Sequence, residues 1–205
     1  MNDKIDRTEA TERYLARIAA REVVVGIVGL GYVGLPLALT FHERGFRVVG
    51  FDVDQSKIDA LAAGKAYIKH LGVDRIIAAS KSDRFEATTD FARLSEVDAI
   101  LIAVPTPLTR QREPEMKYVV STAEAIRPHL KKDQLVVLES TTYPGTTDDL
   151  MRGILDQSGL SADSDYFLAY SPEREDPGNK SFDTATIPKV VGGLDEAATR
   201  VAGAL

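Results

Sequence analysis

Short apolar runs recur along most of the chain and alternate with stretches whose apolar residues follow a helical spacing. From residue 22 onwards the runs predict buried strands, at residues 23–28, 47–51, 85–88, 99–104, 135–138, 167–170 and 189–191. Helical stretches separate most of them, at residues 35–44, 56–63, 73–80, 117–128 and 146–158. Strands that alternate with helices are typical of a parallel sheet. The pattern therefore predicts an α/β fold, a doubly wound and mainly parallel sheet with helices on both faces.

The two ends of the chain differ from this pattern. Residues 1–21 are rich in charge and alanine, and Tyr14, Leu15 and Ile18 fall at helical spacing. They predict a short amphipathic helix that leads into the first strand, with a solvated arm as the alternative. Residues 194–205 read as the start of a further helix, which we expect to be the beginning of a linker helix that the chain does not complete.

Composition and charge exclude several classes of protein. The 205 residues include no cysteine, which rules out disulfides, thiolate metal sites and a cysteine nucleophile within them. The formal net charge of −6 speaks against a general nucleic-acid binder, and residues 139–196 carry 12 acidic but only 4 basic side chains. No apolar run approaches the roughly 20 residues that span a bilayer, and the N-terminus is charged rather than signal-like. We therefore expect a cytoplasmic protein without a membrane partner, and because the three histidines are isolated in sequence we expect no metal site.

A glycine-rich turn carries the first chemical signal. Gly29, Gly31 and Gly34 form a G-x-G-x-x-G pattern directly after an apolar strand and directly before a helical stretch. In that setting the first glycine permits a tight turn, the second lets the backbone approach a pyrophosphate, and the third lets the helix pack on the strand. The helix N-terminus then offers unpaired N–H groups to the anion. The turn predicts a Rossmann-type dinucleotide-binding domain over residues 22–193, with the first strand in the centre of the sheet.

An acidic residue at the end of the second strand completes this fingerprint. Asp52 lies 23 residues after Gly29, where a carboxylate accepts hydrogen bonds from the adenosine ribose and repels a 2′-phosphate, so NAD is favoured over NADP. Lys57 lies five residues further on, where its side chain could cover the edge of the adenosine, which leaves some ambiguity about the phosphorylated cofactor. The alternative is a glycine turn that only packs a helix, with Asp52 or Asp54 capping the helix that follows.

Four segments together resemble one enzyme family. GLGYVGLP (29–36), VPTP (104–107), ESTTYPGT (139–146) and SPEREDPG (171–178) resemble, in order and spacing, the N-terminal half of the nucleotide-sugar 6-dehydrogenases, the UDP-glucose/GDP-mannose dehydrogenase family. The segment at 171–178 is most similar to the branch that oxidises UDP-N-acetylhexosamines. The resemblance runs from about Val24 to Gly193, and members of the family are considerably longer.

The resemblance implies a role for each matching residue. It places the pyrophosphate on the turn, which consists of Gly29, Leu30, Gly31, Tyr32, Val33 and Gly34. Within the turn, by the resemblance, the backbone N–H groups of Tyr32 and Val33 make the contacts. It places Asp52 and Lys57 at the adenosine ribose and Thr106 on the nicotinamide side. Thr142 matches a threonine near the reacting carbon, Glu173 a general acid/base, and Arg174 and Glu175 substrate contacts. The local alternatives are a turn or cap role for Thr142, a solvated loop acid for Glu173, and pairing of Arg174 with Glu175 or Asp176.

The resemblance also implies a reaction that this chain cannot complete alone. In the family, NAD oxidises the C6 hydroxyl of a UDP-sugar twice, through an aldehyde held on a cysteine and then a thioester that is hydrolysed. With no cysteine, the isolated chain is expected to be inactive, the NAD-binding half of an enzyme that forms a homo-oligomer through a region absent here. The alternatives are the cofactor domain of a hydroxy-acid dehydrogenase and a non-catalytic NAD-binding module.

Overall fold

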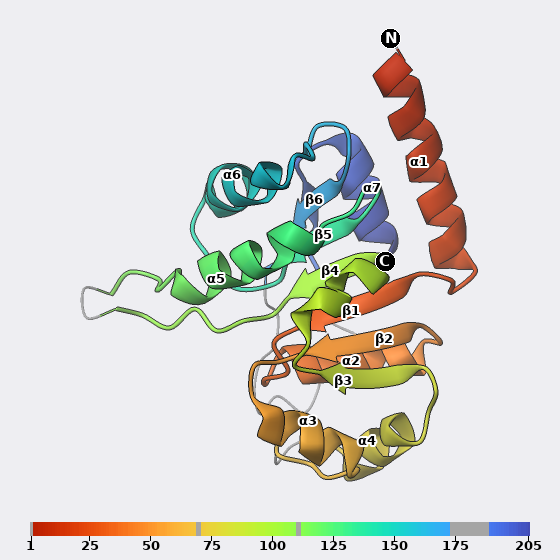
Figure 1. Ribbon diagram of the computed structural model, residues 1–205, viewed down its shortest axis with the longest axis vertical. Coiled ribbons are helices and arrows are strands. Elements are labelled where there is room, and N and C mark those ends of the chain that lie inside the picture. The colour runs from red at the N-terminus through yellow and green to blue at the C-terminus, as the bar shows by residue number, and fades with distance from the viewer. Residues whose placement is uncertain (1, 69–70, 110–111, 173–188) are drawn as a thin grey trace.

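The computed structural model describes residues 2–68, 71–109, 112–172 and 189–205. The strands of the described part form one sheet in the order β3-β2-β1-β4-β5-β6-β7 (Figure 1). All neighbouring pairs are parallel except β6 and β7, which are antiparallel. The strands are β1 (Val24–Val28), β2 (Arg47–Phe51), β3 (Phe85–Thr88), β4 (Ala99–Ile102), β5 (Leu135–Leu138), β6 (Phe167–Tyr170) and β7 (Gly192–Gly193).

The order of the strands confirms the predicted doubly wound sheet. The chain moves outward from β1 through β2 to β3, then returns to β4 on the other side of β1 and continues outward to β6. The first strand is therefore central, and the order reverses beside it, which is where sheets of this kind bind ligands. The helices are α1 (Asn2–Ala19), α2 (Gly34–Glu43), α3 (Gln55–Ala62), α4 (Val73–Ser80), α5 (Lys117–Ile126), α6 (Arg152–Leu155) and α7 (Glu196–Ala204).

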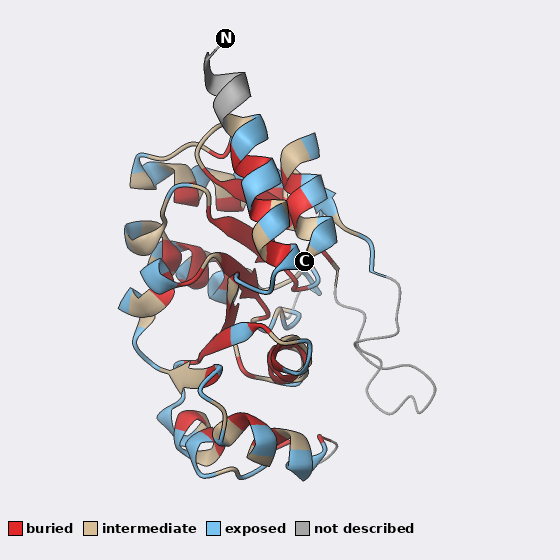
Figure 2. Cartoon of the chain, turned by 90° about the vertical axis from the view of Figure 1, so that its right-hand side faces the viewer, coloured by how far each residue is buried: buried red, intermediate tan, exposed pale blue. Residues whose placement is uncertain are grey.

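Helices cover both faces of the sheet because successive strand residues point to opposite sides. In β4, Ala99 and Leu101 pack in one apolar cluster with α1, α2 and α7. Ile100 and Ile102 pack in a second cluster with α5 and α6. Figure 2 shows the result, buried strands between helices whose outer sides are exposed. The fully apolar strands of the sequence are thus explained by burial on both faces.

Three predicted strands have different limits in the structure, and the one expected at 23–28 differs only by beginning at Val24. The strand expected at 99–104 ends at Ile102. The next residue, Ala103, packs against the glycine turn, with its carbonyl oxygen close to Gly29. The strand expected at 189–191 is wrong: the pairing residues are Gly192 and Gly193, which lie opposite Tyr170 and Ala169. The ammonium group of Lys189 instead contacts the carboxylate of Glu139.

Two predicted helices are less regular than their spacing indicates. The helix expected at 117–128 ends as an α-helix at Ile126 and continues as a 3-10 turn over Arg127–His129, which contains Pro128, a residue without an N–H to donate. The helix expected at 146–158 begins with a wide π turn over Thr146–Met151. There the carbonyl of Gly145 accepts from the N–H groups of both Asp149 and Leu150. The last turn tightens to 3-10 before Gly159.

The N-terminal segment is a helix that packs on the sheet. The buried apolar side chains of α1 in the described part are Ala10, Tyr14 and Ile18, whereas Leu15 is only partly buried. The Tyr14 ring meets Phe167 of β6 edge-on, with 5.8 Å between the ring centroids, and its hydroxyl donates to the carbonyl of Asp98. The predicted amphipathic helix is therefore present, and the solvated arm is not.

Helix α7 shares this packing. Asp195 caps its first turn by accepting from the Ala198 N–H at 2.6 Å, and its other carboxylate oxygen accepts from Arg7 of α1 at 2.8 Å. Ala198 and Val201 are buried in the same apolar cluster as α1 and α2. That α7 begins a linker helix, and that the dinucleotide-binding domain ends at residue 193, stay predictions.

Candidate functional site

The predicted site residues in the described part follow the carboxyl ends of four neighbouring strands. The glycine turn follows β1, Asp52 follows β2, Thr106 lies after β4 and Thr142 after β5. Because parallel strands end at the same edge, the fold brings all four to one side of the sheet, on either side of the point where the strand order reverses.

Two glycines of the turn are required by the fold itself. Gly29 has a φ of +93°, which side-chain-bearing residues rarely adopt, and a Cβ there would lie 2.7 Å from the carbonyl oxygen of Ala103. A Cβ on Gly34 would overlap the carbonyl oxygen of Gly29, so α2 can begin directly against the turn only with glycine at this position. The Gly29 N–H donates to the carbonyl of Phe51 at 2.8 Å, which fixes the turn to the end of β2.

Gly31 differs from the other two, because no neighbour in the described part of the chain requires a glycine here. A Cβ on Gly31 would meet none of the described atoms within 4 Å. The turn is therefore open on this side, and a ligand can approach the backbone here without meeting a side chain. This is the place that a pyrophosphate takes in dinucleotide-binding turns.

The first turn of α2 leaves its positive end available to an anion. The N-cap residue, Val33, makes no side-chain capping hydrogen bond, and no acidic residue lies in the first turn. The N–H groups at a helix N-terminus have no partner within the helix and carry the positive end of its dipole. The open turn at Gly31 and this helix end together fit the phosphates of a dinucleotide.

Asp52 is a buried carboxylate with three donors. Its side chain is 5% exposed. One carboxylate oxygen accepts from the Leu30 N–H at 2.8 Å and from the Lys57 ammonium at 2.7 Å, and the other accepts from the Asp54 N–H at 3.0 Å. Asp52 thus connects the end of β2 to the glycine turn, and its charge is balanced by Lys57. The contact of Asp52 and Lys57 with a ribose stays a prediction.

Helix capping by an aspartate is found two residues further on. Asp54 accepts from the N–H and the hydroxyl of Ser56, at 2.9 and 2.6 Å. These hydrogen bonds lower the pKa of the Asp54 carboxyl. The cap that the alternative interpretation assigned to Asp52 or Asp54 therefore belongs to Asp54, and Asp52 faces the turn instead.

Tyr67 belongs to the site but carries no signal in the sequence. It follows α3, and its hydroxyl donates to the carbonyl of Leu30 at 2.8 Å across 37 residues of chain. Burial, and then the carboxylates of Asp52 and Asp54, raise the pKa of Tyr67 well above its usual value, so the hydroxyl keeps its proton. Only the fold brings this loop against the turn.

Hydroxyl groups join the loops after β4 and β5. Thr106 donates to the carbonyl of Thr141 at 2.8 Å, and Ser140 donates to the carbonyl of Val104 at 2.7 Å. Thr106 is thereby joined to the residue before Thr142, and the contact of both threonines with a nicotinamide stays a prediction. In the described part of the chain the Thr142 hydroxyl has no protein partner, and the local turn is closed by Thr146, which donates to Tyr143. Thr142 is therefore neither a cap nor a turn residue.

The three remaining site residues, Glu173, Arg174 and Glu175, lie outside the described residues. The chain on either side of them is attached to the end of β5. The Ser171 N–H donates to the carbonyl of Leu138 at 3.0 Å, and Lys189 forms an ion pair with the buried carboxylate of Glu139. Sequence reasoning did not single out this pair, since its partners are 50 residues apart.

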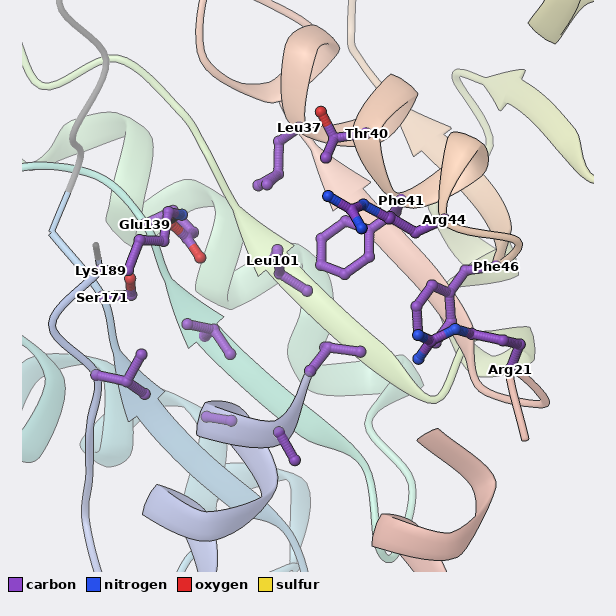
Figure 3. Close-up of a pocket in the computed structure, with 15 residues that line it drawn as sticks. Arg21, Leu37, Thr40, Phe41, Arg44, Phe46, Leu101, Glu139, Ser171 and Lys189 are labelled. Carbon is purple, nitrogen blue, oxygen red and sulfur yellow. Dashed lines mark hydrogen bonds and ion pairs between the residues drawn. The ribbon is translucent and has the colours of Figure 1, made fainter. Parts of the chain in front are cut away.

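A hollow of about 350 Å³ lies beside the site, over β4 and β5 between α2 and α7 (Figure 3). Its floor is apolar, with Leu101 and Val137. Polar residues line both ends, with Glu139, Ser171 and Lys189 at one and Thr40, Arg44 and Arg21 at the other. Among the predicted cofactor and catalytic residues that the structure describes, none lines it. Among the described residues no cluster of three or more His, Cys, Asp or Glu is placed to hold a metal ion. No helix of the described part is both long and apolar enough to span a membrane.

Comparisons with known proteins agree with this geometry. Residues 23–205 match the model of the UDP-glucose/GDP-mannose dehydrogenase family, NAD binding domain. The chain is 36% identical over 179 residues to the UDP-N-acetyl-D-glucosamine 6-dehydrogenase of Pseudomonas aeruginosa, covering 84% of this chain and 40% of that protein. It is 36% identical over 191 residues to the UDP-N-acetyl-D-mannosamine dehydrogenase of Salmonella typhi, covering 88% of this chain and 44% of that protein.

A solved structure gives the same result. The NDP-N-acetyl-D-galactosaminuronic acid dehydrogenase of Methanosarcina mazei Go1 superimposes with a TM-score of 0.80 at 32% identity, over 93% of this chain and 43% of that one. The chain thus spans about two fifths of the length of the relatives it matches. Helix α1 precedes the region that the family model covers.

Proposed function

Since the chain belongs to the UDP-glucose/GDP-mannose dehydrogenase family as its NAD-binding domain, we propose that it supplies the cofactor half of an enzyme that oxidises the C6 hydroxyl of a UDP-N-acetylhexosamine to the uronic acid. The observation that carries the proposal is the glycine turn, which is open at Gly31 and joined to Asp52 at the sheet edge where NAD binds in this family.

The proposed cofactor contacts use groups that the fold has already oriented. The N–H groups of Tyr32 and Val33, at the start of α2, donate to the pyrophosphate. Asp52 accepts from the adenosine ribose with its negative charge close to the 2′ position, and Lys57, held against Asp52, lies at the edge of the same ribose. A 2′-phosphate would face the Asp52 carboxylate at short range, so the site is selective for NAD over NADP.

The proposed catalytic contacts lie after β4 and β5. Thr106, fixed by its bond to Thr141, borders the nicotinamide. Thr142, whose hydroxyl has no partner among the described residues, presents it to the water and polar groups around C6. When bound, NAD would supply the hydride acceptor for the oxidation at C6. By resemblance, Glu173 acts as general acid/base in the release of the product, and Arg174 and Glu175 contact the substrate.

The absence of cysteine sets the limit of what the chain does alone. The second oxidation of the family reaction requires a nucleophile that can be acylated. The family uses a cysteine for this step, and no cysteine is among the proposed site residues. We infer that the isolated chain binds NAD but forms no uronic acid. The rest of the sugar site, and assembly into a homo-oligomer, would come from the part that the relatives have and this chain does not contain.

The choice of substrate rests on the relatives. Two of them are named for UDP-N-acetyl-D-glucosamine and UDP-N-acetyl-D-mannosamine, and they cover more than four fifths of this chain. This favours a UDP-N-acetylhexosamine over a hydroxy acid as the substrate, and an enzyme over a module that only binds NAD.

The test is an assay of uronic acid formation with UDP-N-acetylglucosamine, UDP-N-acetylmannosamine, UDP-glucose and a 2-hydroxy acid. It is run on the 205-residue chain and on a chimera in which this chain replaces the matching domain of the Pseudomonas aeruginosa relative. We expect the chain to be inactive and the chimera to form two NADH for each N-acetylhexosamine oxidised. Sustained NADH formation by the chain alone, or a chimera that oxidises only the hydroxy acid, would overturn the proposal.

A further inference from the structure

Leu30, between the first two glycines of the turn, is held at three separate points. Its N–H donates to Asp52 at 2.8 Å, and its carbonyl accepts from the Tyr67 hydroxyl at 2.8 Å. Its side chain is fully buried and lies directly on Gly50 of β2, where an added Cβ would come within 2.9 Å of both of its methyl groups.

The contacts of Leu30 restrict the backbone of the glycine turn. The neighbours of Leu30 are glycines, which have more conformational freedom than any other residue. Fixing the N–H and the carbonyl of Leu30 sets the orientation of the peptide groups on both of its sides. The peptide groups that follow, those of Gly31 to Val33, are the ones that face the open side of the turn.

The carbonyl of Leu30 depends on Tyr67 for its partner within the described part of the chain. The carbonyls of Gly31 and Val33 take part in the hydrogen bonds of α2, accepting from the N–H groups of Leu35 and Leu37. The carbonyl of Leu30 lies before the helix and accepts instead from the Tyr67 hydroxyl, in the loop after α3. The Tyr67 ring is partly buried against the apolar cluster that includes Leu30. This packing positions the Tyr67 hydroxyl at the Leu30 carbonyl.

We propose that Tyr67 and Gly50 are positioning residues for the cofactor, which together with Asp52 hold Leu30 so that the N–H groups of the turn are oriented for a pyrophosphate before it arrives. The inference rests on the proposed NAD site and adds to it two residues that do not themselves touch the cofactor. Orientation in advance increases affinity because less freedom is lost on binding.

The experiment compares Tyr67→Phe and Gly50→Ala with the wild-type chain. Tyr118→Phe is the matched control, since Tyr118 is exposed on α5, far from the turn in sequence and on a helix of the opposite face. Binding of NAD, ADP-ribose and adenosine is measured by calorimetry and ligand-observed NMR. Hydrogen exchange of the Leu30 amide is measured without ligand, with the amides of β1 as the reference for global stability.

We expect Tyr67→Phe to weaken NAD and ADP-ribose by about threefold to tenfold, the range that corresponds to one lost neutral hydrogen bond. Adenosine, which has no pyrophosphate, should bind as it does to the wild type. The Leu30 amide should exchange faster while the amides of β1 keep their protection. Gly50→Ala should change the same quantities in the same direction, and Tyr118→Phe should change none of them.

The inference is overturned if Tyr67→Phe binds NAD as tightly as the wild type, or if it weakens adenosine and NAD equally. It is also overturned if Leu30 and the β1 amides lose protection together, since that would indicate a general loss of stability. A wild-type chain that does not bind NAD would contradict the proposed function instead, and the exchange experiment, which needs no cofactor, separates the two failures.

Discussion

The carboxylate of Asp52 accepts a hydrogen bond from the backbone N–H of Leu30, 2.8 Å away and across 22 residues of chain. The acid at the end of β2 therefore has two functions in this account. It holds the glycine turn in place, and it presents negative charge where the adenosine ribose of NAD is expected. A substitution at this position should reveal both.

Replacing Asp52 by alanine should weaken NAD binding by about 1–3 kcal/mol, the cost of a polar ligand group left without its partner. Asp52→Asn keeps an oxygen that can accept from Leu30 but removes the charge, so it should keep the fold of the turn and lose much of the discrimination against NADP. Titration of both cofactors measures this. Unchanged NAD affinity in Asp52→Ala, or a wild type that prefers NADP, would show that the ribose assignment is wrong.

Gly31 and Gly34 should respond to alanine in opposite ways. In Gly31→Ala the new methyl group points into open space, so thermal stability should change little while NAD affinity falls by at least tenfold because the methyl occupies the approach of the pyrophosphate. In Gly34→Ala the methyl overlaps the carbonyl of Gly29, so the protein itself should be destabilised. Thermal unfolding and NAD titration of both variants check this contrast. A Gly31→Ala variant with normal NAD affinity would argue against a pyrophosphate at the turn.

The ion pair between Glu139 and Lys189 should contribute measurably to stability. Glu139 is buried, whereas the Lys189 side chain keeps 28% of its surface exposed. We expect Lys189→Met to destabilise the chain by about 1 kcal/mol, closer to the cost of losing an exposed pair than to that of a fully buried one. The double variant with Glu139→Gln should recover most of that loss. Urea unfolding of the single and double variants gives the coupling energy, and additive effects would mean that the pair contributes nothing of its own.

His42 should make the stability of the chain depend on pH. Its side chain is buried in α2 with Nε2 lacking a partner among the described residues. Burial, and then the charge of Arg84, lower the pKa of His42 from its usual 6.5. Because the unfolded chain takes up the proton first, the free energy of unfolding should fall as pH drops below about 6.5 and level off below the folded-state pKa.

The check is urea unfolding at about pH 7.5 and about pH 5.5, for the wild type and for His42→Leu, which cannot titrate. The wild type should lose more stability on acidification than the variant. Equal losses would show that the buried imidazole does not titrate differently in the folded and unfolded chains.

The sequence predicts the part of the site that depends on local order. A strand, a tight turn and a helix follow one another at Gly29 to Gly34, and Asp52 ends the next strand, so the pattern alone brings them together. Tyr67, Glu139 and Lys189 escape such reasoning because their partners lie 37 or 50 residues away. Only the tertiary fold determines these contacts.

Most strands are likewise predictable from the local sequence, whereas one depends on the tertiary fold. Those with continuous apolar runs were predicted to within two residues because burial on both faces demands such residues. Strand β7 was misplaced by three residues. Gly192 and Gly193 have low intrinsic preference for a strand and pair with β6 because α7, which follows directly, packs against that strand.

The most direct test of the account is a titration of the ¹⁵N-labelled chain with NAD, followed by the shifts of its backbone amides. The account predicts saturable binding of one NAD, with the largest shifts at Gly29 to Gly34 and at Asp52, and with little change at Val191 and Ala202, which line the hollow between α2 and α7. Absence of saturable binding at millimolar NAD, or shifts confined to the hollow, would contradict it.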